Sequence, residues 1–210
     1  MGRFPLVVAL VAVLAGCQVA STPVADPIVS PTPHTPVANA ALQAFDVPAD
    51  LKPCPASGPI ATYLTTIKTS NPALAQKLSA QWQALKQSGA QDAAITLFAA
   101  DPAACSAELA ATGTARSAAS VVVIFGEEGQ ADRAWRAGIL GFAPPAPGES
   151  APGVTRGKDT GLGESAWTYH NAPVSLASWR KSVFVALVVV STLDGTAFSA
   201  ATAAVDARLN

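Results

Sequence analysis

Glu164, Ser165 and His170 are the residues of this chain whose types best suit hydrolytic chemistry. A serine hydroxyl becomes a nucleophile when a histidine accepts its proton, and a glutamate acts as an acid or a base beside them. The spacing argues against such a site, because an odd separation along one strand places Ser165 and His170 on opposite faces. Trp167 also occupies the position where a nucleophile elbow needs its second glycine. We therefore predict that the protein is not an enzyme, and we keep a hydrolase that uses Ser165, Glu164 and His170 as an alternative.

Metal, cofactor and nucleic-acid chemistry are not indicated by the sequence. It contains no H-x-x-x-H, no paired C-x-x-C and no acidic loop of the calcium-binding type. Gly157, Gly161 and Gly163 resemble a phosphate-binding loop, but we expect neither a strand before them nor a glycine-containing helix after them. The formal charge is −1 and no basic stripe is present, so nucleic acid is not an expected partner. We predict no metal and no cofactor.

Aromatic side chains are the best candidates for ligand contact. Trp167, Tyr169 and Trp179 fall on two expected neighbouring strands. There they form a cross-strand cluster that only packs, or they line a groove for a ligand or a glycan. Trp82 and Trp135 follow helical spacing instead, which favours core packing.

The first cysteine follows an apolar run from Phe4 to Val13, within the stretch Leu14-Ala15-Gly16-Cys17. This stretch resembles the lipobox of bacterial lipoproteins, with a small residue before the cysteine and an aliphatic residue further back. A transmembrane helix needs about 20 apolar residues, so the run is too short to be one. An ordinary secretory signal fits the run but leaves Cys17 without a role.

The resemblance implies a signal peptide over residues 1–16 and a lipid on Cys17. The protein is then held at the outer leaflet of the cell membrane or at the outer membrane, in the extracytoplasmic cell envelope. Its expected partners are the membrane, through this lipid, and a protein or ligand of the envelope.

An exported protein meets oxidising conditions, which bears on the other two cysteines. With Cys17 assigned to the lipid, Cys54 and Cys105 remain as an even pair, and a disulfide between them is favoured. Two separate buried thiols are the other interpretation. A redox role is less favoured because no C-x-x-C motif brings two sulfur atoms together.

Proline divides the chain into a tether and a domain. Residues 17–53 contain frequent prolines with serine and threonine between them, which favours an extended and unpacked chain. We predict a disordered tether over residues 17–53 and a single folded domain over residues 54–210. The prolines of this stretch are Pro23, Pro27, Pro31, Pro33, Pro36, Pro48 and Pro53.

Within the domain, apolar spacing predicts helices first and strands later. A helix capped by Asn71 is expected to run to Gly89, a second helix to begin at Asp92, and a third short segment to hold Cys105. Strands are expected at residues 120–125, 167–170, 174–179 and 183–193, with helices after Gly126 and after Asp194. This order predicts an α+β fold: a largely antiparallel sheet with helices packed on it and a helical N-terminal half.

The last third of the chain resembles small lipid-anchored or sensor-type extracytoplasmic domains. The resemblance is carried by Gly161-Leu162-Gly163-Glu164-Ser165-Ala166, followed by an aromatic strand, a hairpin and a closing helix. We therefore expect a lipid-anchored envelope protein that presents a non-catalytic domain for binding a ligand or a partner. A carrier of apolar ligands is a further alternative, and it requires a cavity of several hundred Å³.

Overall fold

A computed structural model describes residues 34–106, 115–146, 148–149 and 151–210. The expected signal peptide, the lipobox with Cys17 and the first part of the tether lie outside the described residues. Within the part that is described, no helix combines the length and the apolar composition needed to cross a membrane.

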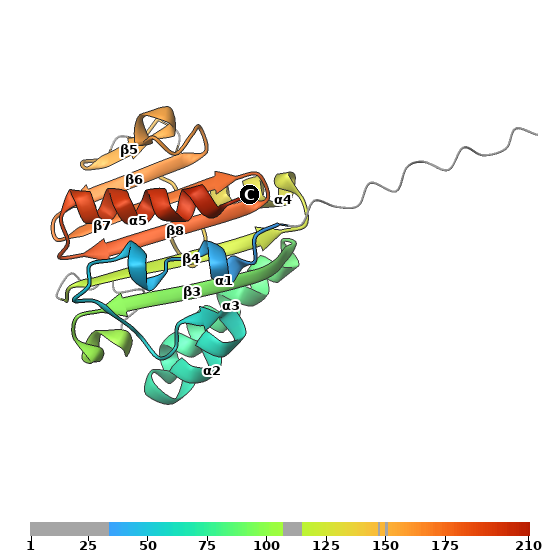
Figure 1. The fold of residues 1–210 in the computed structure, drawn as a ribbon. Helices are drawn as coiled ribbons and strands as arrows, with labels where there is room; N and C mark the ends of the chain where they lie inside the picture. The colour runs from blue at the N-terminus through green and yellow to red at the C-terminus, as the bar shows by residue number, and fades with distance from the viewer. Residues whose placement is uncertain (1–33, 107–114, 147, 150) are drawn as a thin grey trace, which may run out of the picture. The chain divides into compact units, whose positions relative to one another are not determined.

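One antiparallel sheet forms the centre of the domain (Figure 1). The strand order is β1-β3-β4-β8-β7-β6-β5, with β2 also paired to β3, and the pairings between the described strands are antiparallel. The strands are β1 (Lys52–Pro53), β2 (Gly58–Pro59), β3 (Ala90–Ala99), β4 (Ser117–Phe125), β5 (Val154–Arg156), β6 (Ala166–Asn171), β7 (Val174–Lys181) and β8 (Phe184–Ser191).

Helices cover both faces of this sheet. Figure 1 views the sheet from the side of α1 and α5, while α2, α3 and α4 pack on the other face. The helices are α1 (Val37–Ala40), α2 (Ile60–Ser70), α3 (Pro72–Gln87), α4 (Glu128–Ala137) and α5 (Gly195–Arg208), and the short 3-10 helices are η1 (Ala44–Asp46), η2 (Pro102–Ser106) and η4 (Gly157–Thr160).

The two layers of helices explain why β4 and β8 are apolar on both faces. Val121 lies opposite Leu187 and points to the layer of α2, α3 and α4, whereas Val122 lies opposite Ala186 and points to α1 and α5. All eight residues of β8 are buried. Burying apolar surface on both sides of a strand is the main stabilising contribution to a sheet of this kind.

The α+β class and the antiparallel sheet are confirmed, as are several element boundaries. Asn71 caps α3 as expected, because its side chain accepts a hydrogen bond of 3.1 Å from the backbone N–H of Leu74. Asp194 caps α5 in the same way through the N–H of Ala197, at 2.8 Å.

The prediction of a helical N-terminal half is wrong. Residues 90–99, where the second helix was expected, form the ten-residue strand β3. Ile95 and Leu97 point to one layer of helices, while Phe98 points to the other. Apolar residues on both faces of a strand give spacings that also fit a helix, so this short run carries no decisive period.

The expected tether is also too long, because its last part belongs to the domain. α1 and η1 lie within residues 17–53, and the side chain of Leu42 is 1% exposed in the core beneath α5. The backbone N–H of Leu42 donates a hydrogen bond of 2.9 Å to Oγ of Ser120 in β4. Arg208 of α5 forms an ion pair with Asp46 of η1. The prolines of this stretch separate short apolar segments that pack against distant residues, and local sequence does not reveal such contacts.

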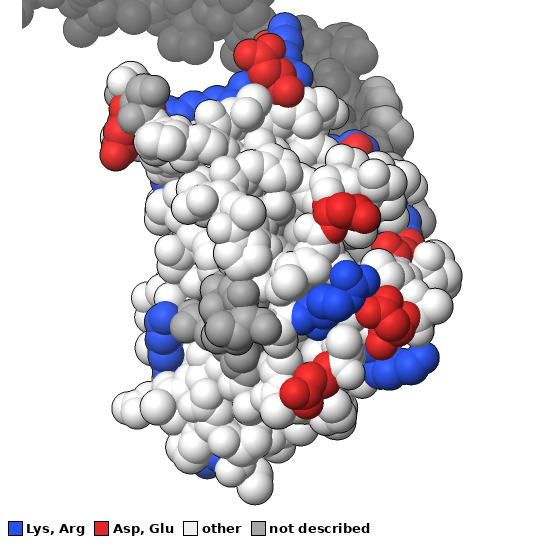
Figure 2. Space-filling view, turned by 90° about the vertical axis from the view of Figure 1, so that its left-hand side faces the viewer, with Lys and Arg blue, Asp and Glu red and all other residues white. Residues whose placement is uncertain are grey.

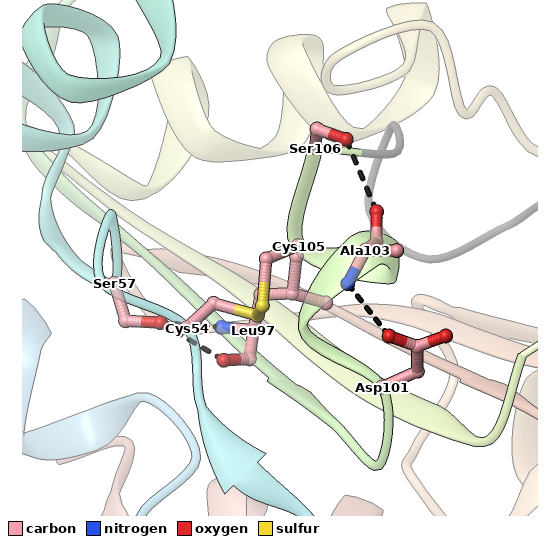
Figure 3. Close-up of a disulfide and its surroundings, with 7 residues drawn as sticks. All are labelled: Cys54, Ser57, Leu97, Asp101, Ala103, Cys105 and Ser106. Carbon is pink, nitrogen blue, oxygen red and sulfur yellow. Dashed lines mark hydrogen bonds between the residues drawn. A yellow bond between two sulfur atoms is a disulfide. The ribbon is translucent and has the colours of Figure 1, made fainter. Parts of the chain in front are cut away.

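The disulfide between Cys54 and Cys105 is confirmed (Figure 3), with the two Cα atoms 5.4 Å apart. The bond joins the segment after β1 to η2, which follows β3. Cys54 is already held there, because its N–H donates to the carbonyl of Leu97 at 2.8 Å. Ser57 bridges the backbone of Leu97 as well, accepting from its N–H and donating to its carbonyl.

Candidate ligand-binding site

The three aromatic residues proposed for ligand contact do not share one face of the sheet. Trp167 lies opposite Ser178 and points to the layer of α2, α3 and α4, where Tyr169 also lies. Trp179 lies opposite Ala166, the neighbour of Trp167, and therefore points to α5. A cross-strand cluster that includes Trp179 is thus wrong, because one position along a strand reverses the face.

A pocket of about 630 Å³ opens beside Trp167. We call it the Trp pocket. It lies at the end of the sheet, where β6 pairs with the edge strand β5. The other walls come from α4 and from the loop after it, residues 142–146 and 148–149, which we call the Pro-rich loop. The volume of the pocket falls within the range of sites for small molecules. It is lined by Trp135, Arg136, Pro144, Pro145, Ala146, Arg156, Gly157, Glu164, Ala166 and Trp167.

Pairing between β5 and β6 positions the central side chains of the pocket. Arg156 lies opposite Trp167 in this pairing, so both point to the same face. The guanidinium of Arg156 donates hydrogen bonds to the carbonyls of Ala146, at 2.9 Å, and Glu149, at 2.5 Å. Arg156 therefore holds the Pro-rich loop in place as a wall of the pocket.

The other two charged residues of the pocket have acidic or basic partners. Arg136 Nε lies 2.8 Å from Asp132 Oδ2, one helical turn earlier in α4, and this hydrogen bond raises the pKa of Arg136 above its ordinary value. Glu164 Oε1 lies 3.0 Å from Lys158 Nζ, and both side chains are exposed. Arg156 makes no ion pair with any residue that the structure describes.

Two buried indole N–H groups in the pocket walls lack acceptors. Nε1 of Trp135 and Nε1 of Trp167 are both buried without a hydrogen-bond partner among the described residues. The Trp167 side chain as a whole is only 7% exposed. Leaving a buried donor unsatisfied costs about 1–3 kcal/mol, so each such group calls for an explanation. Both nitrogen atoms are closed off from solvent, so neither N–H opens into the pocket, and a molecule bound there does not reach them.

Glu164, Ser165 and His170 do not converge on one site. Ser165 precedes β6 and His170 lies near its other end, so the two residues are about 16 Å apart at ~3.3 Å per residue. His170 Nδ1 lies 2.8 Å from Oγ of Ser175, its cross-strand neighbour, and its ring packs edge-on against Phe198. Glu164 pairs with Lys158.

The serine that contacts His170, Ser175, was not expected from the sequence. No carboxylate of the described residues bonds to the His170 ring. The pair thus lacks the third group that orients a catalytic histidine. It is explained as a polar contact between two neighbouring strands.

The face of the domain shown in Figure 2 carries no large charged patch among its described residues. On the face shown in Figure 2, lysine, arginine, aspartate and glutamate form small mixed groups, and uncharged residues cover most of the surface. Among the described residues, no group of three or more histidine, cysteine, aspartate or glutamate side chains is placed to hold a metal ion.

No family model, curated protein or solved structure matches the chain.

Sequence reasoning missed most of the pocket. Arg136, Arg156 and the two loop prolines Pro144 and Pro145 were not expected to contact a ligand, and β5 was not expected as a strand. Trp135 was assigned to core packing, and it packs against the core while also lining the pocket. The available signal was the Pro-rich loop itself, because loops held by a rigid scaffold often carry function.

Proposed function

We propose that the protein is a lipid-anchored cell-envelope protein whose α+β domain binds a ligand in the Trp pocket without converting it. The observation that carries the proposal is a pocket of about 630 Å³ whose walls combine two tryptophans and two prolines with the guanidinium of Arg156. The lipobox-like stretch ending at Cys17 supports the anchor, with the domain outside the cytoplasm at the cell membrane or the outer membrane.

Binding is tested with N-phenyl-1-naphthylamine, a neutral fluorophore that brightens in apolar surroundings. The full chain carrying Cys17→Ser is used, so that no acyl chain competes for the probe. Ala146 is exposed and lines the pocket, and its hydrogen bonds use only its backbone. Ala146→Trp therefore fills the pocket without removing those bonds, and we expect it to lower the affinity for the fluorophore about tenfold or more.

Ala200→Trp is the matched control, because Ala200 is exposed on α5, which covers the other face of the sheet. We expect this variant to bind the fluorophore like the parent chain. Absence of binding in the parent chain, or equal binding by Ala146→Trp, would show that the Trp pocket is not a ligand site.

The anchor is tested separately in cells with a labelled fatty acid. We expect the natural chain to take up the label and to remain with the membrane, and Cys17→Ser to lose both properties. Normal membrane retention of Cys17→Ser would refute the anchor and leave the pocket proposal intact.

Two alternatives remain, and each has a distinct test. The carrier of apolar ligands is favoured by the volume of the pocket but not by its walls, which are formed by tryptophan, proline and arginine rather than leucine and valine. The hydrolase requires His170, so a broad hydrolase screen with His170→Ala as the comparison decides it. An activity that disappears in this variant would overturn a purely binding role.

A further inference from the structure

We infer that the ligand of the Trp pocket is an amphipathic monocarboxylate, whose carboxylate binds beside Arg156 and whose apolar part packs on the tryptophans and prolines. The inference rests on the proposed binding function and adds the chemical class of the ligand. Its basis is that the unused polar groups in the walls are donors, and that the described surroundings carry one excess positive charge.

The pocket walls contain guanidinium N–H donors that have no acceptor among the described residues. A guanidinium has five N–H donors, and the described partners of Arg156 are only two backbone carbonyls. Arg136 uses Nε for Asp132, and no described residue accepts from its terminal nitrogen atoms.

Acceptors near the pocket are already engaged. The carbonyl of Ala146 accepts from Arg156, and Glu164 pairs with Lys158. Glu149 Oε2 accepts from the N–H of Ala146 at 3.1 Å, which closes the turn of the loop. Each of these acceptors already has a donor, whereas the two guanidinium groups have donors to spare, so a ligand that brings acceptors gains the most hydrogen bonds.

The charges around the pocket favour a negatively charged ligand and limit how much negative charge it can carry. Asp132 does not neutralise Arg136 alone, because the same carboxylate also lies 3.5 Å from Arg180. The charged residues that line the pocket are two cations, Arg136 and Arg156, and one carboxylate, Glu164, an excess of one positive charge.

One negative charge on a planar group fits this environment best. A carboxylate matches the fork of a guanidinium in two parallel hydrogen bonds. A phosphate monoester carries close to two negative charges at neutral pH and exceeds the positive charge available. The rest of the ligand is apolar, because Trp167, Trp135 and two prolines form the remaining walls.

The test compares head groups on one chain length: decanoate, decanol, decyltrimethylammonium and decyl phosphate, each below its micelle concentration. Each compound displaces N-phenyl-1-naphthylamine from the full chain carrying Cys17→Ser. We expect decanoate to bind about tenfold or more tightly than each of the other three, since a hydrogen bond to a charged group is worth at least a factor of ten.

Variants assign the preference to residues. Arg156→Gln also removes the bonds to the loop, so the change in decanol affinity measures the effect on that wall. Decanoate affinity should fall about tenfold more than decanol affinity. Arg133→Gln is the control, because it removes the same charge from an exposed position on α4 that does not line the pocket.

The outcomes separate the two proposals. Equal affinity for the four head groups would leave the pocket as a ligand site and refute the carboxylate. Tighter binding of decyl phosphate or of the cation would refute it as well. Failure of the parent chain to bind the fluorophore and all four compounds would instead remove the proposed function, and with it the ligand class.

Discussion

The indole N–H of Trp179 donates a hydrogen bond of 3.0 Å to Oδ1 of Asp206 and so joins β7 to α5. Trp179 is fully buried beneath α5. Lys181, two residues further along β7, donates to the other oxygen of Asp206 at 3.1 Å. The carboxylate of Asp206 therefore connects the last helix to the sheet at two points, and Trp179 has a structural role on the face opposite the Trp pocket.

Trp179→Phe should lower the free energy of unfolding by about 1–3 kcal/mol. The change removes a hydrogen bond to a charged group and leaves space at a fully buried site. Urea unfolding followed by circular dichroism measures the effect. Binding of N-phenyl-1-naphthylamine should stay unchanged, because Trp179 does not line the pocket. Lost binding with unchanged stability would contradict the structural role.

Strong local signals made part of the fold predictable from the sequence. β8 and β4 follow from unbroken runs of β-branched and apolar residues, which few other structures accommodate. α3 follows from its cap at Asn71 and its apolar stripe, and the disulfide from the number of cysteines. Each of these features depends on residues close together in the sequence, or on a simple count.

Features that depend on distant contacts were not predictable. The alanines of β3 fit a helix as well as a strand, and only pairing with β4 decides between them. The Trp pocket depends on the register that places Arg156 opposite Trp167, and on the bonds from Arg156 to the loop. Neither relation leaves a periodic pattern in the sequence.

Leu42→Ala should destabilise the domain by about 2–5 kcal/mol. Leu42 is 1% exposed between the sheet and α5, and removing a buried leucine side chain leaves a cavity. Urea unfolding measures the change. Phe45→Ala is the matched control, because Phe45 is 81% exposed and its described ring contact is with Arg208. Phe45→Ala should lower the free energy of unfolding by less than about 1 kcal/mol. Equal losses of stability in the two variants would show that the segment around Leu42 belongs to the tether and not to the domain.

Replacing both Cys54 and Cys105 with alanine should lower stability by about 2–5 kcal/mol. The disulfide closes a loop between residues 51 positions apart, and its loss allows the unfolded chain more conformations. The comparison is made by urea unfolding in the Cys17→Ser chain. A thiol-labelling count on the unfolded, non-reduced protein serves as the control. Two reactive cysteines in that count would contradict the disulfide.

The pKa of Asp50 should rise when Arg116 is replaced. Arg116 Nε donates to Asp50 Oδ2 at 2.9 Å, and this hydrogen bond is the main cause that lowers the pKa of Asp50 below its ordinary value of 3.8. A carboxyl whose pKa is lowered on folding contributes stability above its unfolded pKa and loses it as the pH falls through the folded pKa. That loss therefore occurs below about pH 3.8.

An NMR titration of the Asp50 carboxyl measures this shift directly. Arg116→Gln should move the pKa back toward 3.8, because it removes both the hydrogen bond and the attraction of the guanidinium. Lys52→Gln is the control, since Lys52 contributes the least of the causes that lower this pKa. A larger rise in Lys52→Gln than in Arg116→Gln would show that Arg116 is not the main cause that lowers the pKa of Asp50.

Gly153 and Gly161 have almost the same backbone conformation, with φ at +79° and +78°, but different surroundings. A Cβ atom at Gly153 would lie 2.1 Å from the carbonyl oxygen of His170, whereas a Cβ at Gly161 would meet nothing within 4 Å. Gly161→Ala should therefore cost only the strain of an alanine at positive φ, about 1–2 kcal/mol.

Gly153→Ala should cost that strain and about 1–3 kcal/mol more, because backbone must move to relieve the overlap. The segments that must separate are the entry to β5 and the end of β6, where the N–H of His170 donates to the carbonyl of Gly153 at 2.8 Å. β5 carries Arg156, so decanoate affinity should fall in Gly153→Ala and not in Gly161→Ala. Urea unfolding and fluorophore displacement on both variants make the comparison. Equal losses of stability would mean that the close approach to His170 does not fix the position of β5.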